Sequence, residues 1–268
     1  MATVGLTALS PLHADPAAIP LSEALQKKQG LTGKLTGDGA YRLDLSIENS
    51  AATPARVEIP AGFICKTAAG NRVIVLRGTQ LEIAAHGASD AQIPTAALAS
   101  TNAVEKAAPF TPVADAEPKL ASLLKYLSTR TDVPRETSQL ITFAILEDIT
   151  FAKWQQFLAA RPADQTTPAQ AQPSLAEITQ AIDALGVLRE IAPDRAFALA
   201  SDPELKLRAL RNPICRAKAL QLYGMTIPGD TAAGGVPPDL GQLLHTKPGD
   251  NCPICRMRAQ MQGPASDL

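Results

Sequence analysis

Apolar and polar residues alternate with a period of two in the first hundred positions of the chain. Between residues 41 and 48, every second side chain is apolar, which is typical of a strand with one buried face. Shorter alternating runs follow at 56–59 and 80–83, and short or continuous apolar runs lie at 63–65 and 73–76. Turn residues separate them, and the series ends at 92–94. Short strands spaced about ten residues apart predict an immunoglobulin-like β-sandwich over residues 19–108. A short helix is predicted ahead of them, at 21–29, where Leu21 and Leu25 share one face.

After residue 118 the apolar positions follow the period of a helix. Leu120, Leu123, Leu124 and Leu127 fall at i, i+3, i+4 and i+7, which is one helix face. Further helix starts are predicted near Pro134, Phe151 and the capping box that opens at Ser174, and at two Asx-Pro pairs, Asp202-Pro203 and Asn212-Pro213. We therefore expect an α+β chain with an α-helical domain over residues 119–224. A proline-rich linker over residues 109–118 should join it to the sandwich.

The two ends of the chain carry no such periods. Residues 1–18 contain no Lys or Arg, and the apolar stretch at 4–9 is too short for a secretory signal. This favours a disordered extension and a cytoplasmic over a secreted protein. Residues 225–268 are rich in Gly and Pro and predict a flexible tail. No apolar run is long enough to span a membrane.

The composition argues against a nucleic-acid-binding function. The net charge is −1 and 46% of residues are hydrophobic, so the chain is globular and has no overall basic character to suit a nucleic acid. One stretch is basic, but no aromatic residue lies among its cations, which predicts a solvent-exposed helix face. Its cations are Lys206, Arg208, Arg211, Arg216 and Lys218.

Residues 57–62 read V-E-I-P-A-G, and in this region the chain resembles a group of largely uncharacterised bacterial proteins. Their pattern is a short helix, strands ending in an N-x-S…V-x-I-P-A-G segment, and a Q-x-A-I/V-W helix. The resemblance covers about residues 19–158 and implies a β-sandwich with a helical appendage, but no established reaction. The chain departs from the pattern at residues 144–146, which read A-I-L where the pattern has a Trp. We expect the strand to leave its sheet at Pro60 and to turn at Gly62 with a positive φ.

The sharpest chemical motif is Cys252-Pro253-Ile254-Cys255, a CxxC pair. At the start of a helix, such a pair can serve thiol redox chemistry. With Cys215 and His245 it could instead form a Cys₃His zinc site. However, Cys215 and His245 lie far apart in the sequence and do not form a ligand pair, and a loop rather than a strand precedes the motif. Ordinary thiols or one disulfide are therefore favoured.

A third arrangement involves Cys65 and Gln139. Some secreted bacterial adhesin domains form a Cys–Gln thioester between a β-sandwich and a helix, and this chain is predicted to place Cys65 and Gln139 on such elements. A core cysteine and an unrelated glutamine are the favoured interpretation.

No histidine lies in a recognisable nucleophile motif, so no catalytic residue is assigned. We therefore expect a non-enzymatic binding or assembly module of a bacterial protein, without a cofactor. It should act on a protein partner or through self-association, and not on nucleic acid. The alternative is a zinc-binding or thiol-redox protein centred on Cys252 and Cys255, with one structural Zn held by Cys215, His245, Cys252 and Cys255.

Overall fold

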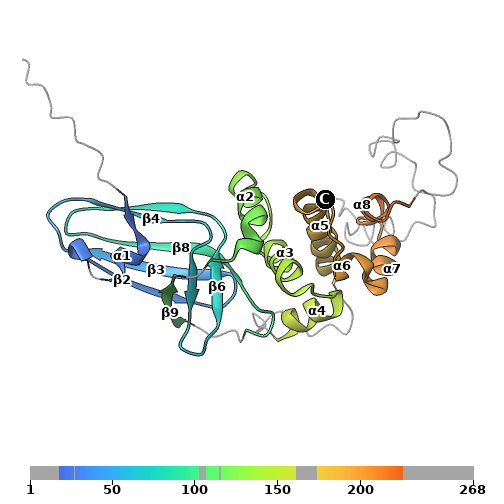
Figure 1. The fold of residues 1–268 in the computed structure, drawn as a ribbon, viewed down its shortest axis with the longest axis horizontal. Coiled ribbons are helices and arrows are strands. Elements are labelled where there is room, and N and C mark those ends of the chain that lie inside the picture. Colours follow the sequence, from blue (N-terminus) through green and yellow to red (C-terminus); the bar gives the residue numbers. More distant parts are fainter. Residues whose placement is uncertain (1–17, 27, 103–106, 115, 161–173, 226–268) are drawn as a thin grey trace, which may run out of the picture. The chain divides into compact units, whose positions relative to one another are not determined.

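A computed structural model describes residues 18–26, 28–102, 107–114, 116–160 and 174–225 of the chain (Figure 1). By their contacts, the described residues up to Met225 belong to one compact unit. The extension predicted for residues 1–18 lies outside the described residues except for Ala18. The tail predicted for residues 225–268 lies outside them except for Met225.

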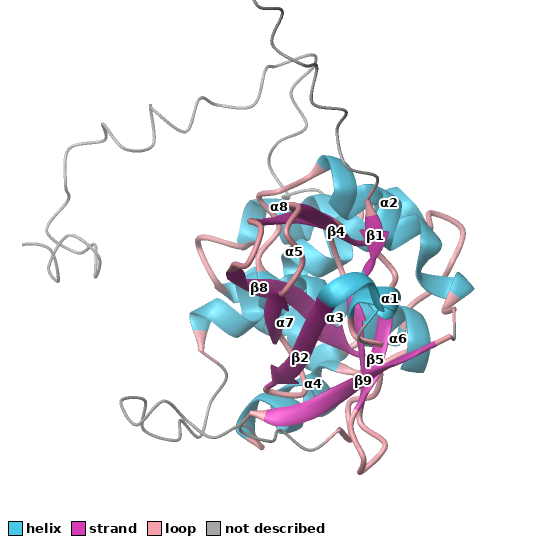
Figure 2. Cartoon of the chain, turned by 90° about the vertical axis from the view of Figure 1, so that its left-hand side faces the viewer, coloured by secondary structure: helices cyan, strands magenta, loops and turns pink. Residues whose placement is uncertain are grey.

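Six strands form a closed antiparallel barrel in the order β2-β3-β8-β6-β5-β9. They are β2 (Leu31–Gly37), β3 (Arg42–Asn49), β5 (Ile64–Lys66), β6 (Arg72–Val75), β8 (Ala88–Ala97) and β9 (Ala108–Val113). Figure 2 shows several of these strands together with the helices of the same unit. The predicted immunoglobulin-like β-sandwich is therefore wrong, although an α+β architecture holds.

Two strands close the barrel because each changes partner along its length. β8 pairs with β3 as far as Pro94 and then with β6 from Thr95 to Ala97. β9 pairs with β2 as far as Phe110 and then with β5 from Thr111. Alternation along a strand indicates which face is buried but not which strand lies beside it. This is why the sequence pattern suited a sandwich as well as a barrel.

The expected proline-rich linker begins inside the barrel. Residues 109–113 belong to β9, although Pro109 and Pro112 suggested a stiff connection. A proline cannot donate to the hydrogen-bond ladder of a sheet, so it is tolerated where the facing strand needs no donor at that position. Here Pro109 faces Thr36 of β2 and Pro112 faces Cys65 of β5.

A three-stranded sheet, in the order β1-β4-β7, accompanies the barrel. It consists of β1 (Ile19–Pro20), β4 (Ala55–Ile59) and β7 (Thr79–Ile83). β4 ends just before Pro60, and Gly62 follows with φ +85°, as the sequence predicted. The short helix α1 (Leu21–Ala24) and a 3₁₀ turn (Lys28–Gly30) replace the longer helix expected at 21–29.

The alternating pattern of β3 does bury one face. Leu43, Leu45 and Ile47 are at most 1% exposed and lie in a hydrophobic core with Cys65 and Phe110. A second core joins the end of the barrel to the helices, with Tyr41 and Ile74 on the barrel side. On the helical side Trp154 stacks on Phe157, their ring centroids 5.5 Å apart.

The helical part begins with a 3₁₀ turn (Pro118–Leu120) and seven α-helices follow in the described residues. They are α2 (Ala121–Thr129), α3 (Arg135–Glu147), α4 (Phe151–Ala159), α5 (Leu175–Ile191), α6 (Ala198–Ser201), α7 (Pro203–Arg211) and α8 (Arg216–Leu222). The predicted leucine face of α2 is buried at Leu120, Leu123 and Leu127, and Leu124 is half-buried.

Polar side chains join the barrel to the helices. Gln139 of α3 accepts a hydrogen bond from the Ala97 amide at 2.8 Å and donates one to the Ala97 carbonyl at 2.9 Å. Arg77, between β6 and β7, donates to the carbonyls of Leu127 and Arg130 at the end of α2 and of Val133 in the loop before α3. A cation at a helix C-terminus satisfies carbonyls that have no partner within the helix. The barrel and the helices are therefore bonded to each other as well as packed.

Candidate functional site

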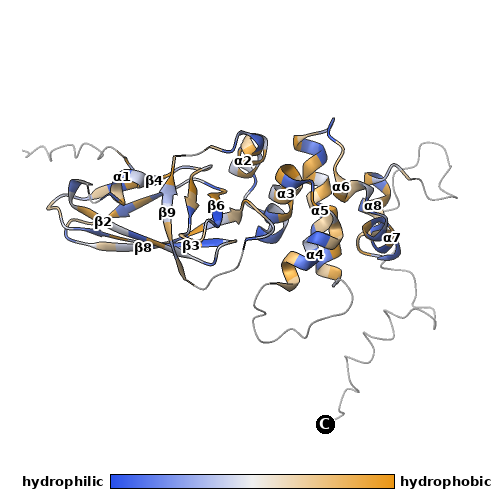
Figure 3. Ribbon diagram, turned by 60° about the horizontal axis from the view of Figure 1, so that its bottom comes forward, coloured by the Kyte–Doolittle hydropathy of each residue, from blue (hydrophilic) through white to orange (hydrophobic). Residues whose placement is uncertain are grey.

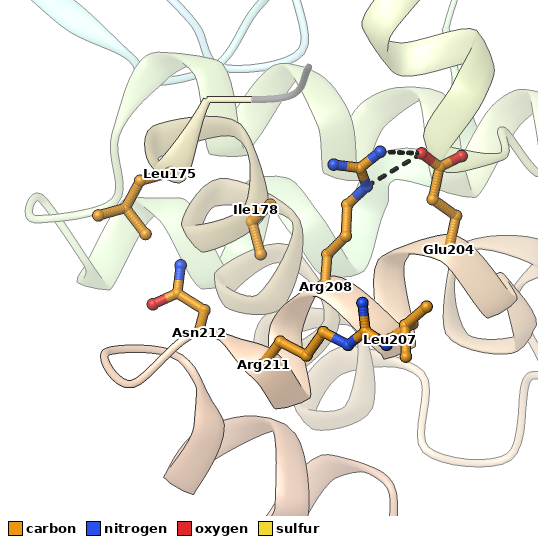
Figure 4. A pocket seen from close by; sticks show the side chains of 7 residues that line it. All are labelled: Leu175, Ile178, Glu204, Leu207, Arg208, Arg211 and Asn212. Carbon is orange, nitrogen blue, oxygen red and sulfur yellow. Dashed lines mark hydrogen bonds and ion pairs between the residues drawn. The ribbon is translucent and has the colours of Figure 1, made fainter.

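The helix α7 has two different faces, and the second of them forms a candidate site. Leu205 and Ala209 are buried against the rest of the helical part. Leu207 points away from them, because two residues along a helix correspond to about 200° of rotation. It shares a stripe with the residues at i−3, i+1 and i+4, which line one open groove with it. These residues are Glu204, Leu207, Arg208 and Arg211 (Figure 4).

The opposite wall of the groove is the first turn of α5. Ser174 caps this helix, because its hydroxyl accepts a hydrogen bond from the Glu177 amide at 3.3 Å. The cap starts the helix at Leu175, and Ile178, three residues later, therefore lies on the same face. Figure 4 shows these two side chains on α5 and the charged pair of α7 across from them. The groove has a volume of about 590 Å³.

Two Asx residues hold α7 in place at its ends. At the start, Asp202 Oδ1 accepts hydrogen bonds from the amides of Glu204 and Leu205, both at 3.0 Å. At the end, Asn212 Oδ1 accepts from the Ile214 amide at 2.9 Å, so the chain turns before α8. The cap at Asp202 is the one that Asp202-Pro203 predicted, but the helix start predicted at Asn212-Pro213 is wrong, because Asn212 does not cap α8. The second pair makes a turn, and α8 itself begins three residues after Pro213.

Large apolar side chains are exposed at this groove and in few other places. Only four large hydrophobic residues among those described are exposed, and two of them line the groove: Leu175, 45% exposed, and Leu207, 50% exposed. A third, Ile214, is 68% exposed and follows directly after the turn at Asn212. A clustered apolar patch rimmed by polar groups is typical of an interaction surface.

The rim of the groove is positively charged. The charged residues that line it are Glu204, Arg208 and Arg211, two cations and one anion. Arg208 donates two hydrogen bonds to Glu204, at 2.7 and 3.0 Å, and Lys218 forms an ion pair with Asp183. Arg211 is exposed and has no partner among the described residues. Figure 3 shows α7 as one of the more hydrophilic helices of the chain.

Lys206, on the side of α7 away from the groove, is engaged by an aromatic ring. Its ammonium lies 5.2 Å from the centroid of the Tyr223 ring. Burial, and then the nearby charge of Asp202, raises the pKa of Tyr223 to about 12. This tyrosine is therefore neutral over the physiological pH range and adds no charge to the helical part.

The four zinc ligands considered from the sequence are not brought together within the described residues. Cys215 is buried, 3% exposed, and its Sγ lies 3.3 Å from the Thr179 hydroxyl. His245, Cys252 and Cys255 lie outside the described residues. In the part of the chain that the structure describes, no three His, Cys, Asp or Glu side chains are grouped so that they could hold a metal ion.

Cys65 and Gln139 have separate structural roles. Cys65 is fully buried in the barrel core, and this burial raises the pKa of its thiol to about 12. A thiol with such a pKa stays protonated and is a poor nucleophile. Both amide atoms of Gln139 are bonded to the backbone of Ala97. This geometry fits a structural cysteine and a structural glutamine, not a thioester pair.

The groove itself was missed in the sequence, although a signal for it existed. The cations of α7 and α8 predict a solvent-exposed helix face, and a charged face of this kind gives no reason to expect an apolar groove. Leu207 lies among them, out of phase with the buried Leu205 and Ala209. An apolar residue on an otherwise charged helix face is the signal that could have predicted a surface patch.

Comparison with known proteins adds no relative. No family model, no curated protein and no solved structure matches the chain. Among the described residues, no helix is both long and apolar enough to cross a membrane.

Proposed function

We propose that the protein is a non-enzymatic binding module that docks a different protein through the groove between α5 and α7. The observation that carries this proposal is that two of the exposed large apolar side chains, Leu175 and Leu207, line the same groove. Water contact with this apolar surface is unfavourable, and a partner that presents leucine-like side chains would remove it.

The energetics of interfaces support a site of this kind. A few apolar anchors surrounded by polar residues usually supply most of the binding energy. Leu175 and Leu207 are the two exposed apolar residues that could act as anchors. The polar residues around them are Glu204, Arg208 and Arg211. Function as a binding module requires neither a catalytic group nor a cofactor.

The test compares partner binding by three forms of the full chain. The double variant Leu175→Ser with Leu207→Ser removes both anchors, and both residues are exposed enough to leave the fold intact. The control variant Met225→Ser truncates a similarly exposed residue, 42% exposed, that does not line the groove. A protein retained by the wild type from an extract of the source organism is purified and titrated against all three forms.

We expect the control to bind as the wild type does. The double variant should bind at least about thirtyfold more weakly, since each lost anchor costs about 1 kcal/mol or more. Equal binding by the double variant would overturn the proposal. Sedimentation of the wild type alone tests whether a second copy of the chain binds in the groove instead. A dimer that dissociates in the double variant would show that a second copy, and not a different protein, occupies the groove.

A further inference from the structure

We infer that the segment bound in the groove is an acidic amphipathic helix. This inference rests on the proposed function and adds the chemistry of the partner. It follows from two independent properties of the site, the nature of its walls and the distribution of its charges.

Both walls of the groove are helices, so their main chains have few hydrogen bonds to offer. α5 and α7 pair their backbone groups internally, and side chains cap both helix starts, at Ser174 and Asp202. An extended segment placed here would leave its own amides and carbonyls unpaired against apolar side chains, which is costly. A helix satisfies its backbone internally and offers apolar residues at i, i+3 and i+4. The partner is therefore helical.

The charged residues of the groove determine which charge the partner helix should carry beside its apolar stripe. Glu204 is the only acidic residue between Pro203 and Leu222, and its carboxylate is already bonded to Arg208. Arg211 lines the groove one turn after Leu207 and has no partner among the described residues. A carboxylate beside the apolar stripe of the partner can form a two-pronged pair with this guanidinium. A basic helix would instead meet like charge.

The experiment uses two synthetic peptides and the full-length protein. Both peptides are Ala-based, capped and about 18 residues long, so that they can form a helix, and both carry the same Leu stripe. The acidic peptide carries Glu beside the stripe, and the basic peptide carries Lys at the same positions. Fluorescence anisotropy measures each affinity at low and at high salt. The variants are Arg211→Glu and, as control, Arg135→Glu, which makes the same charge change at the start of α3.

We expect the acidic peptide to bind the wild type about fivefold to tenfold more tightly than the basic one at low salt, with a smaller difference at high salt. Arg211→Glu should reverse this order, and Arg135→Glu should preserve it. Equal affinities, no binding of either peptide, or an order unchanged by Arg211→Glu would overturn the acidic helix. If both peptides bind equally and the double leucine variant abolishes both interactions, the groove remains the docking site and only its charge selectivity is lost.

Discussion

At the scale of single residues, Gln139 shows how a side chain can take the place of a strand. β3 pairs with β8 only as far as Pro94, and on that side the Thr95 amide still donates to the Tyr41 carbonyl at 3.0 Å, but Ala97 lies beyond the paired residues of β3. The amide of Gln139 has the same donor and acceptor as a peptide group and bonds both backbone atoms of Ala97. A sheet edge buried under a helix needs such partners, since unpaired buried backbone groups are destabilising.

We expect the variant Gln139→Leu to lower the free energy of unfolding by on the order of 2–4 kcal/mol, because two buried backbone groups of Ala97 lose their partners. Gln139→Glu should be pH-dependent. Its protonated carboxyl group can make both bonds, but its ionised form faces the Ala97 carbonyl, so the folded state raises the pKa of that group. The stabilisation from these two bonds is therefore fully present in the Gln139→Glu variant below a pH of about 4. It is lost as the pH rises through the raised pKa of the new carboxyl group.

Urea unfolding of the wild type and both variants between about pH 4 and pH 8 measures these differences. The difference between Gln139→Leu and the wild type should not change with pH, which makes this variant the control. A constant difference for Gln139→Glu over the same range would contradict the proposed pairing with Ala97.

At the scale of elements, the sequence predicted the helices better than the barrel. The leucine face at 120–127 and the cap at Ser174 depend on residues within one or two turns, so a local pattern contains them. Barrel closure depends on β9 pairing with β2, more than 70 residues earlier, and no local pattern encodes that choice. Similarly, Asp202 was predictable as the cap of α7, but its second bond was not.

Asp202 joins two helices that are distant in the sequence. Its Oδ1 caps α7, and its Oδ2 accepts a hydrogen bond from the amide of Phe151, the first residue of α4, at 3.1 Å. Asp148 makes a similar link from the end of α3 to the amide of Ala198, at 2.8 Å. One carboxylate thus satisfies amides at two helix starts, where free N–H groups favour negative charge.

The two oxygens of Asp202 can be tested separately. Asn in its place keeps an acceptor for the α7 cap but directs an NH₂ group at the Phe151 amide. We expect Asp202→Asn to reduce the free energy of unfolding by about 1–2 kcal/mol and Asp202→Ala, which also loses the cap, by about 2–4 kcal/mol. Thermal or urea unfolding measures both, with Asp194→Asn, an exposed aspartate nearby, as the control. Equal losses for the Asn and Ala variants would contradict the expected contribution of the α7 cap, because the bond to α4 would then account for the whole effect.

At the scale of the whole described unit, one of the two hydrophobic cores is shared between the barrel and the helices. This core contains Tyr41, Ile74 and Leu76 from the barrel side and Leu123 and Phe143 from the helical side. The proline-rich stretch was expected to separate two independently packed domains, but the contacts place everything up to Met225 in one compact unit. Parts that share a core lose stability together, so the unit should unfold cooperatively.

The last prediction concerns this cooperativity. Trp154 is the only tryptophan of the chain and reports on the helices, whereas hydrogen exchange of the β3 amides reports on the barrel. We expect both probes to give the same free energy of unfolding. The variant Arg77→Met removes three hydrogen bonds from the barrel to the end of α2 and the loop that follows it. It should lower both values equally, by on the order of 1–3 kcal/mol, because a cooperative unit transmits a local loss to all of its parts. Had the two parts packed independently, the barrel amides would keep their protection while the Trp154 transition shifted alone.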